Sequence, residues 1–296
     1  MVTIRKKNIK SKGYYYLEHS YREGDTVKKK EKYLGTVLPK NIDEIKKTFL
    51  QEIYQEKWYA LFDRIKQGFS SELQVTPKSI QEKELHTFMI KFTYDTQKIE
   101  GSTLTLRETA NLLEKGITPK EKPLRDIKEA EAHKTVFYEM LQCTKDLSLD
   151  LVLSWHKKLF DQTQGEIAGK IRTHGVAISG SKFLPPTPVE VGLLLTEFFA
   201  WYNHTKRKIH PVESAALAHL KFVTIHPLGD GNGRISRLTM NFVLHKHSYP
   251  LLDIPYENRN SYYHALERSQ VKQNTSIFTQ WFFRRYILEN KKYLKQ

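Results

Sequence analysis

The chain has 296 residues, which favours about two domains, and its 48 Lys and Arg against 33 Asp and Glu give a net charge of +15. The single cysteine, Cys143, excludes a disulfide framework and a cysteine-rich zinc module. No apolar run is long enough to span a bilayer and no apolar segment follows the basic start, so we expect a cytoplasmic protein without a membrane partner. The basic excess fits nucleic acid, a polyphosphate ligand, an acidic partner or simply a lysine-rich composition.

The first 40 residues carry nearly half of this excess. They hold eleven Lys and Arg against four acids, 11 − 4 = +7, and their aromatic or charge-alternating runs at 14–17 and 27–34 flank Glu-Gly-Asp at 23–25. Turn residues between such runs are typical of a hairpin. We therefore predict a basic β-rich extension over residues 1–40, with a ribbon that ends near Gly35.

Helical patterns dominate the remaining chain. From residue 42 onward, apolar residues recur every three or four positions, and Gly68 and Gly101 are predicted helix ends. Further amphipathic stretches cover about 105–115, 123–143, 149–160, 188–203, 211–225, 233–247, 259–269 and 275–290. The later strand signal is confined to about 174–184, around a Gly-Val-Ala-Ile-Ser-Gly sequence. The predicted fold class is mainly α.

Residues 226–237, between two helical patterns, combine the residue types of a phosphate-transfer site. Their Gly-Asn-Gly sequence directly precedes a helix start, which is the composition of a backbone N–H nest for phosphate. Arg234 and Arg237 share the face of the first turn, Asp230 offers a hard oxygen ligand for Mg²⁺, and His226 is suited to act as a general base. Each feature alone is more often a turn, a solvated helix face or a structural histidine; together they indicate a nucleotide-transfer site.

This segment resembles the signature of Fic domains, His-x-Phe-x-Asp/Glu-Gly-Asn-Gly-Arg-x-x-Arg, except that Leu228 stands in place of Phe and is expected to pack in the core. The resemblance covers about residues 85–290. It implies a Fic-type helical bundle, and the segment before Pro185 resembles the short β-hairpin flap with which the family holds its target. The implied domains are the 1–40 extension, a 41–110 helical region and a 111–296 catalytic domain.

The resemblance implies transfer of AMP from ATP, with Mg²⁺, to a hydroxyl side chain (Ser, Thr or Tyr) of a target protein. His226 would be the catalytic base, Asp230 the metal ligand, and Arg234 and Arg237 the contacts of the β- and γ-phosphates. The other implied nucleotide-binding residues are Gly180, Ser181, Lys182, Phe183, Gly231, Asn232, Gly233, Tyr262 and Gln270. At Gln270 the family pattern would lead us to expect Asn.

A second resemblance lies upstream, at 96–101. By its residues alone, Gly101 follows a helix end and Glu100 is an acid in the last turn, which is ordinarily a solvated glutamate. The sequence also resembles the inhibitory motif of Fic proteins, Ser/Thr-x-x-x-Glu-Gly/Asn, with Thr96 as its first residue. This implies an N-terminal inhibitory helix whose Glu100 pairs with Arg237. The same glutamate could instead serve removal of AMP.

Two other classes of function compete with this interpretation. The tyrosine-bearing ribbon at 1–40 is suited to bind nucleic acid, although a lysine-rich ribbon is more often a solvated edge. A catalytically dead scaffold is disfavoured, because every polar signature position is intact. Fic proteins of this kind often dimerise, and the chain itself is an expected target, but the sequence identifies neither an interface nor another target.

Overall fold

The computed structural model describes residues 2–23 and 26–294, and the chain forms two compact units, residues 1–63 and 64–296. In the first unit, three strands form an antiparallel sheet in the order β1-β2-β3: β1 Val2–Ile9, β2 Lys12–Glu23 and β3 Thr26–Gly35. The predicted ribbon and its end at Gly35 are confirmed, whereas β1 was not predicted. Part of the predicted turn, 24–25, lies outside the described residues.

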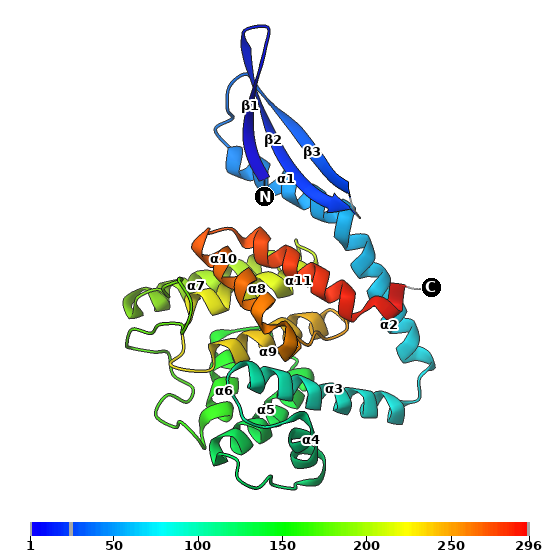
Figure 1. Ribbon diagram of the computed structural model, residues 1–296, viewed down its shortest axis with the longest axis vertical. Helices are drawn as coiled ribbons and strands as arrows, with labels where there is room; N and C mark the ends of the chain where they lie inside the picture. Colours follow the sequence, from blue (N-terminus) through cyan, green and yellow to red (C-terminus); the bar gives the residue numbers. More distant parts are fainter. Residues whose placement is uncertain (1, 24–25, 295–296) are drawn as a thin grey trace. The chain divides into compact units, whose positions relative to one another are not determined.

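Helix α1 (Ile42–Tyr54) covers one face of this sheet (Figure 1). Phe49 and Ile53 of α1 pack on Leu17 of β2, which is fully buried, and Lys32 of β3 pairs with Glu52 at 2.8 Å. The unit therefore extends beyond the predicted ribbon boundary at residue 40, because the sheet buries its apolar face only against α1.

The chain continues through the π-helical turn η1 (Gln55–Tyr59) into α2 (Ala60–Val75), and the predicted helix end at Gly68 is wrong. Gly68 lies inside α2, where a Cβ would be only 3.0 Å from the Cβ of Tyr293. The glycine allows this close approach rather than ending the helix.

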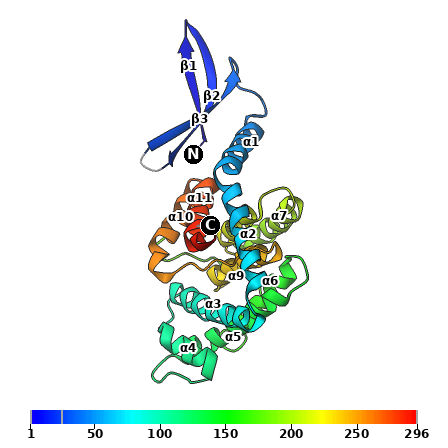
Figure 2. The ribbon, with the colours of Figure 1, turned by 90° about the vertical axis from the view of Figure 1, so that its right-hand side faces the viewer.

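The second unit is a bundle of helices (Figures 1 and 2). Beyond α2 its helices are α3 Lys78–Ile99, α4 Leu106–Lys115, α5 Leu124–Gln142, α6 Leu149–Phe160, α7 Pro188–Thr205, α8 Pro211–Ile225, α9 Asn232–Lys246, α10 Arg259–Val271 and α11 Thr275–Glu289, with short 3₁₀ turns η2 Tyr256–Asn258 and η3 Lys291–Leu294. These positions agree closely with the predicted stretches. Among the described residues, every helix is too short or too polar to cross a membrane.

The expected strands at 174–184 are absent from this described segment. Ser181 N donates to Ile178 O at 3.1 Å and closes a turn at Gly180, but the flanking residues do not pair as strands. Instead, the Arg172 guanidinium binds the carbonyls of His174 and Pro186 at 2.9 and 2.6 Å. An arginine side chain therefore fixes the ends of the segment in place of a β-ladder.

Candidate active site

The loop between α8 and α9, with the first turns of α9, holds the signature residues, and the shape of the loop requires two positive backbone φ angles. His226 ends α8 at φ +51°, and Gly231 lies just before α9 at φ +78°. A Cβ on Gly231 would also overlap the ring of Phe160. A glycine is therefore needed at 231 for both conformation and space.

A cavity of about 350 Å³ opens at this loop. Its lining includes six predicted site residues, Glu100, His226, Asp230, Gly231, Asn232 and Gly233, together with residues 174–177 of the segment that resembles the flap. Gly180, Ser181, Lys182, Phe183, Tyr262 and Gln270 do not belong to this lining, and Arg234 and Arg237 lie buried behind it. The structure therefore brings together His226, Asp230 and the glycine loop at one opening.

His226 is arranged to keep a neutral imidazole with one free nitrogen. With Nδ1 protonated, it donates to Val223 O at 3.1 Å, which leaves Nε2 as the acceptor. Burial, assisted by the positive charge of Arg172, lowers the pKa of His226. A neutral imidazole whose Nε2 has an available lone pair meets the chemical requirement of a general base.

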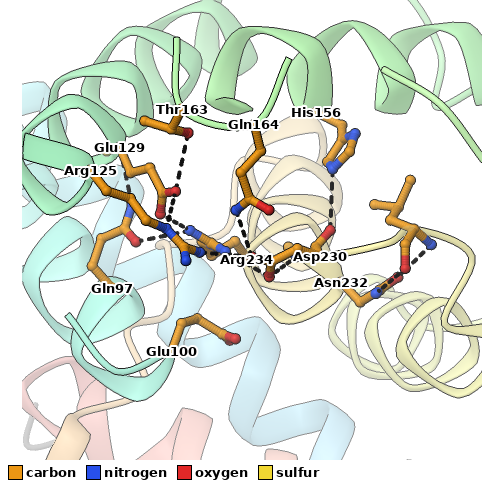
Figure 3. Close-up of polar contacts among 12 residues, drawn as sticks. Gln97, Glu100, Arg125, Glu129, His156, Thr163, Gln164, Asp230, Asn232 and Arg234 are labelled. Carbon is orange, nitrogen blue, oxygen red and sulfur yellow. Dashed lines mark hydrogen bonds and ion pairs between the residues drawn. The ribbon is translucent and has the colours of Figure 1, made fainter. Parts of the chain in front are cut away.

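Asp230 is ionised and surrounded by donors. Its Oδ1 accepts from Gly231 N at 2.5 Å and Arg234 Nη2 at 2.9 Å, while Oδ2 accepts from Arg125 Nη2 at 2.8 Å and Gln164 Nε2 at 2.9 Å (Figure 3). Burial disfavours its charge, but the charge of Arg234 and the hydrogen bonds outweigh burial and lower the pKa of Asp230 to about 2.

The surroundings of Asp230 fit Mg²⁺ only together with a phosphate ligand. Among residues 2–23 and 26–294, no three His, Cys, Asp or Glu side chains gather to hold a metal ion. Mg²⁺ commonly uses one or two carboxylates and completes its shell with phosphate oxygens and water. Asp230 lines the cavity. Because the Arg125 side chain is half-exposed, it is able to move away from Asp230 Oδ2 and leave that oxygen available to a metal ion.

The Asn232 side chain shapes the loop from within. It is buried, accepts from Leu228 N and donates to Leu228 O, both at 2.9 Å. Leu228 is itself buried, as expected for the residue that replaces Phe. In this structure the Asn232 amide therefore faces the loop backbone, away from the role of phosphate contact that the resemblance implies for it.

Arg234 is also held inside the protein. Its guanidinium pairs with Glu129 and Asp230 (Figure 3). It also lies 4.5 Å from the ring centroid of Phe160. Only 2% of its side chain is exposed. A buried guanidinium with two carboxylate partners braces the start of α9 against α5.

Glu100 and Arg237 form the ion pair that the resemblance to the inhibitory motif implies. Glu100 caps the C-terminus of α3, and its Oε1 lies 2.6 Å from Arg237 Nη2. Thr96 accepts from the same guanidinium through its hydroxyl and its carbonyl, both at 3.2 Å. Burial disfavours the charge on Arg237, but Glu100 outweighs that cost and raises the pKa of Arg237.

The Glu100 carboxylate also lies against the first turn of α9. A Cβ on Gly233 would collide with Glu100 Oε1 and lie 3.0 Å from Arg237 Nη1. A helix N-terminus and an arginine together attract anions. Glu100 therefore occupies the place where these features favour a phosphate group.

The remaining predicted positions lie apart from the cavity lining. The Tyr262 hydroxyl is buried between Arg237, at 3.4 Å, and His219, at 2.9 Å. Gln270 donates to Thr224 Oγ1 at 3.2 Å, and Lys182 N donates to Glu267 at 2.7 Å. Tyr262, Gln270 and Lys182 therefore contact residues other than His226 in this structure.

Residues 146–244 match the Fic/DOC family. The chain contains a Fic domain of this family.

Among curated relatives, the protein adenylyltransferase Fic of Drosophila yakuba is 36% identical over 179 residues, which are 59% of this chain and 36% of that protein. Protein adenylyltransferase fic-1 of Caenorhabditis elegans is 33% identical over 182 residues, with 59% and 35% covered. A Fic domain containing signaling protein from Bacteroides thetaiotaomicron superposes with a TM-score of 0.71 at 27% identity, over 78% of this chain and 96% of the other. The match thus spans about a third of the curated relatives' length.

The Fic domain has supporting residues that sequence reasoning missed. Glu129 pairs with Arg234, and Gln164 and Arg125 contact Asp230. His156 joins Asp230 O, at 3.2 Å, to Gly169 N, at 3.0 Å. These residues lie on α5, α6 and the following loop, so no local spacing links them to the signature. The sequence feature that could have identified them is a polar residue on an otherwise apolar helix face.

Proposed function

We propose that this Fic domain transfers AMP from ATP to a hydroxyl side chain of a protein. The observation that carries the proposal is a neutral, partly buried His226 that lines one cavity together with the N-terminus of α9. The protein adenylyltransferases that resemble the chain over 59% of its length support the same reaction class.

In the proposed step, Nε2 of His226 accepts the proton of the target hydroxyl. The hydroxyl oxygen bonds to the α-phosphorus of ATP, and the bond between that phosphorus and the pyrophosphate leaving group breaks. The backbone of Gly231, Asn232 and Gly233 would cradle the phosphates, and Arg234 and Arg237 would neutralise the β- and γ-phosphates. Asp230 would hold Mg²⁺, which neutralises phosphate charge when it is bound. Positioning and charge neutralisation suffice for this chemistry.

We propose that Glu100 inhibits this reaction. Its carboxylate neutralises Arg237 and lies where a terminal phosphate would approach Gly233. ATP that binds beside Glu100 would therefore lack its contact with Arg237 and adopt an unproductive geometry. In the reverse direction, the same glutamate would orient a water for removal of AMP from a modified target, so the proposal includes both directions.

The segment 174–184 is the proposed contact for the target backbone, and Gly180, Ser181, Lys182 and Phe183 would border the nucleotide. Tyr262 and Gln270 would contact its other side. The expected protein substrates include the chain itself, and a homodimer and a cytoplasmic location are part of the proposal.

Labelled ATP and mass spectrometry test the proposal in the presence of Mg²⁺. We expect Glu100→Gly to increase transfer of AMP to the chain and to lysate proteins, and His226→Ala to abolish it. Glu121→Gly is the matched control: Glu121 is exposed and has φ +58°, so glycine removes the same charge without strain. If Glu100→Gly is no more active than the parent, inhibition by Glu100 is wrong; if no variant forms an AMP adduct, the transfer reaction is wrong.

A second candidate, nucleic-acid binding, is favoured by the sheet face that α1 leaves open. Lys7 stacks 4.6 Å from the ring centroid of Tyr16, and Tyr14, Tyr16 and Tyr33 cluster on that face. Such cations beside aromatic rings suit the phosphate backbone and the bases of a nucleic acid. Against this candidate, Lys7 and Lys29 are already ion-paired with Glu31.

A gel shift with single- and double-stranded DNA and RNA tests this candidate over a range of salt. We expect Lys10→Glu with Lys12→Glu, at the exposed β1–β2 turn, to weaken binding and reduce its salt dependence. Lys46→Glu with Lys47→Glu makes the same charge change on α1 and serves as the control. No shift at low salt, or an equal loss in both double variants, would eliminate a specific surface on the sheet.

A further inference from the structure

Arg172, in the loop between α6 and α7, is a buried arginine with an unusual set of partners. Its residue is only 4% exposed, and its three hydrogen-bond acceptors are backbone carbonyls. Within the part of the chain that the structure describes, no carboxylate forms an ion pair with it. Burial lowers the pKa of Arg172 accordingly. Burying such a charge is costly unless its hydrogen bonds are well made, so its position needs an explanation.

Two of the three carbonyls belong to residues that line the cavity, His226 and His174, and the third belongs to Pro186, at the far end of the segment that begins at His174. Nε donates to His226 O at 2.7 Å, Nη1 to His174 O at 2.9 Å and Nη2 to Pro186 O at 2.6 Å. The backbone N of Arg172 also donates to Pro227 O at 2.9 Å. One planar guanidinium therefore joins both ends of the segment between His174 and Pro186 to the backbone of the proposed base.

The bond to His226 O acts where the backbone is strained. His226 adopts φ +51°, a left-handed conformation that is uncommon for a residue with a side chain. Its carbonyl and that of Pro227 are both fixed by Arg172, while its Nδ1 is fixed by Val223. Strained conformations persist where surrounding contacts over-determine them.

The fork geometry of arginine is what makes this arrangement feasible. The five N–H donors of a guanidinium lie in one plane and reach three separate carbonyls. A lysine ammonium at the same site would have all of its donors on one nitrogen and would not reach all three. The charge of the guanidinium acts separately, because it opposes protonation of the nearby His226 imidazole.

We propose that Arg172 is a positioning residue of the transfer reaction, which holds the 174–186 segment and the His226 backbone in one geometry. This inference rests on the proposed function for its kinetic test. Arg172 touches neither the nucleotide nor the hydroxyl in this role; it acts through His226 and through the loop that forms the opposite wall of the cavity.

Two variants in the Glu100→Gly background separate geometry from charge. Arg172→Lys keeps the charge but loses the fork, and we expect kcat to fall about 10- to 100-fold, with a smaller change in KM for ATP, because small misplacements at a reacting centre are costly. Arg172→Met loses both, and we expect in addition that the acid limb of the pH profile of kcat/KM moves to higher pH. Lys170→Gln, which removes a positive charge two residues away on the exposed side of the loop, should stay within twofold.

Hydrogen exchange provides a measurement that does not depend on activity. We expect faster exchange in 175–185 in Arg172→Lys, with α8 and α9 as protected as in the parent. If the Glu100→Gly enzyme transfers no AMP, the proposed function fails and the exchange pattern alone decides the role of Arg172. If that enzyme is active but both variants match it in kcat, pH profile and exchange, the inference is wrong. Faster exchange throughout α8 and α9 would also overturn it, because Arg172 would then support the fold as a whole.

Discussion

Charged side chains are stabilised in contrasting ways on the open face of the sheet and at the N-terminus of α9. On the sheet, Lys29 pairs with Glu18 at 2.5 Å and with Glu31 at 2.8 Å, yet 41% of its side chain remains exposed. At α9, the side chains of Arg234 and Arg237 are 2% and 1% exposed. A half-exposed cation keeps water when a partner leaves, whereas a buried guanidinium depends on that partner. A ligand or a substitution is therefore able to change the electrostatics at the N-terminus of α9 more than those on the open face of the sheet.

The strongest test of this contrast is Glu129→Gln, which removes the buried charge facing Arg234. We expect the free energy of unfolding to fall by about 2–4 kcal/mol, because the buried Arg234 loses one of its two carboxylate partners and keeps Asp230 alone. Urea denaturation measures the change. Glu131→Gln, on the same helix with an exposed side chain that pairs with Lys128, is the control. Equal midpoints for the two variants would contradict the contrast.

Glu100→Gln should have a smaller effect and one that ATP reverses. Its carboxylate is 26% exposed, so we expect a loss of about 1–2 kcal/mol from the unpaired Arg237. Because phosphate would then replace the missing anion, ATP with Mg²⁺ should raise the melting temperature of the variant more than that of the parent. Thermal melts with and without ATP measure the difference, with Glu121→Gln as control. An identical ATP shift in the variant and the parent would argue against competition at Arg237.

A pH-dependent effect is expected at Asp253, which follows α9 and lies 2.5 Å from Lys91 of α3, beside Asp95. Burial and the neighbouring Asp95 raise the pKa of Asp253 despite the charge of Lys91. Above the unfolded pKa of about 4, the native state thus retains a proton that the unfolded chain has released, and stability falls as pH rises toward the raised value.

Asp253→Asn should flatten this dependence of the urea midpoint on pH. The exposed Asp150, in the first turn of α6, provides the matched control through Asp150→Asn, which should leave the slope unchanged. A variant at 253 whose slope equals that of the parent would show that Asp253 does not carry the effect.

The smallest effect is expected at Lys32, which pairs with Glu52 in the sheet unit. Both side chains are about 40% exposed, at 38% and 41%, so we expect Lys32→Ala to change the free energy of unfolding by less than about 1 kcal/mol. Urea denaturation at low and high salt checks this value. A loss as large as that of Glu129→Gln would remove the distinction between the two regions.

The sequence predicted the helices from α4 to α11 within a few residues because amphipathic periodicity is a local property. Gly68 misled the prediction because its neighbour Tyr293 lies far along the chain. The strand signal at 174–184 failed for a related reason: a β-rich composition forms strands only where a partner is available, and here Arg172 holds the segment by its ends.

By itself, the sequence determined which chemical groups stand at the start of α9, because their spacing along one loop and one helical turn is local. His226, Asp230 and the glycines were therefore recognisable from that spacing alone. The resemblance to the inhibitory motif implied one distant pair, between Glu100 and Arg237. The other distant partners were decided only by the tertiary structure: Glu129 reaches Arg234 from α5, and Arg172 binds the carbonyl of His226. Such contacts depend on how distant segments pack, and packing also sets the burial that makes each charge matter.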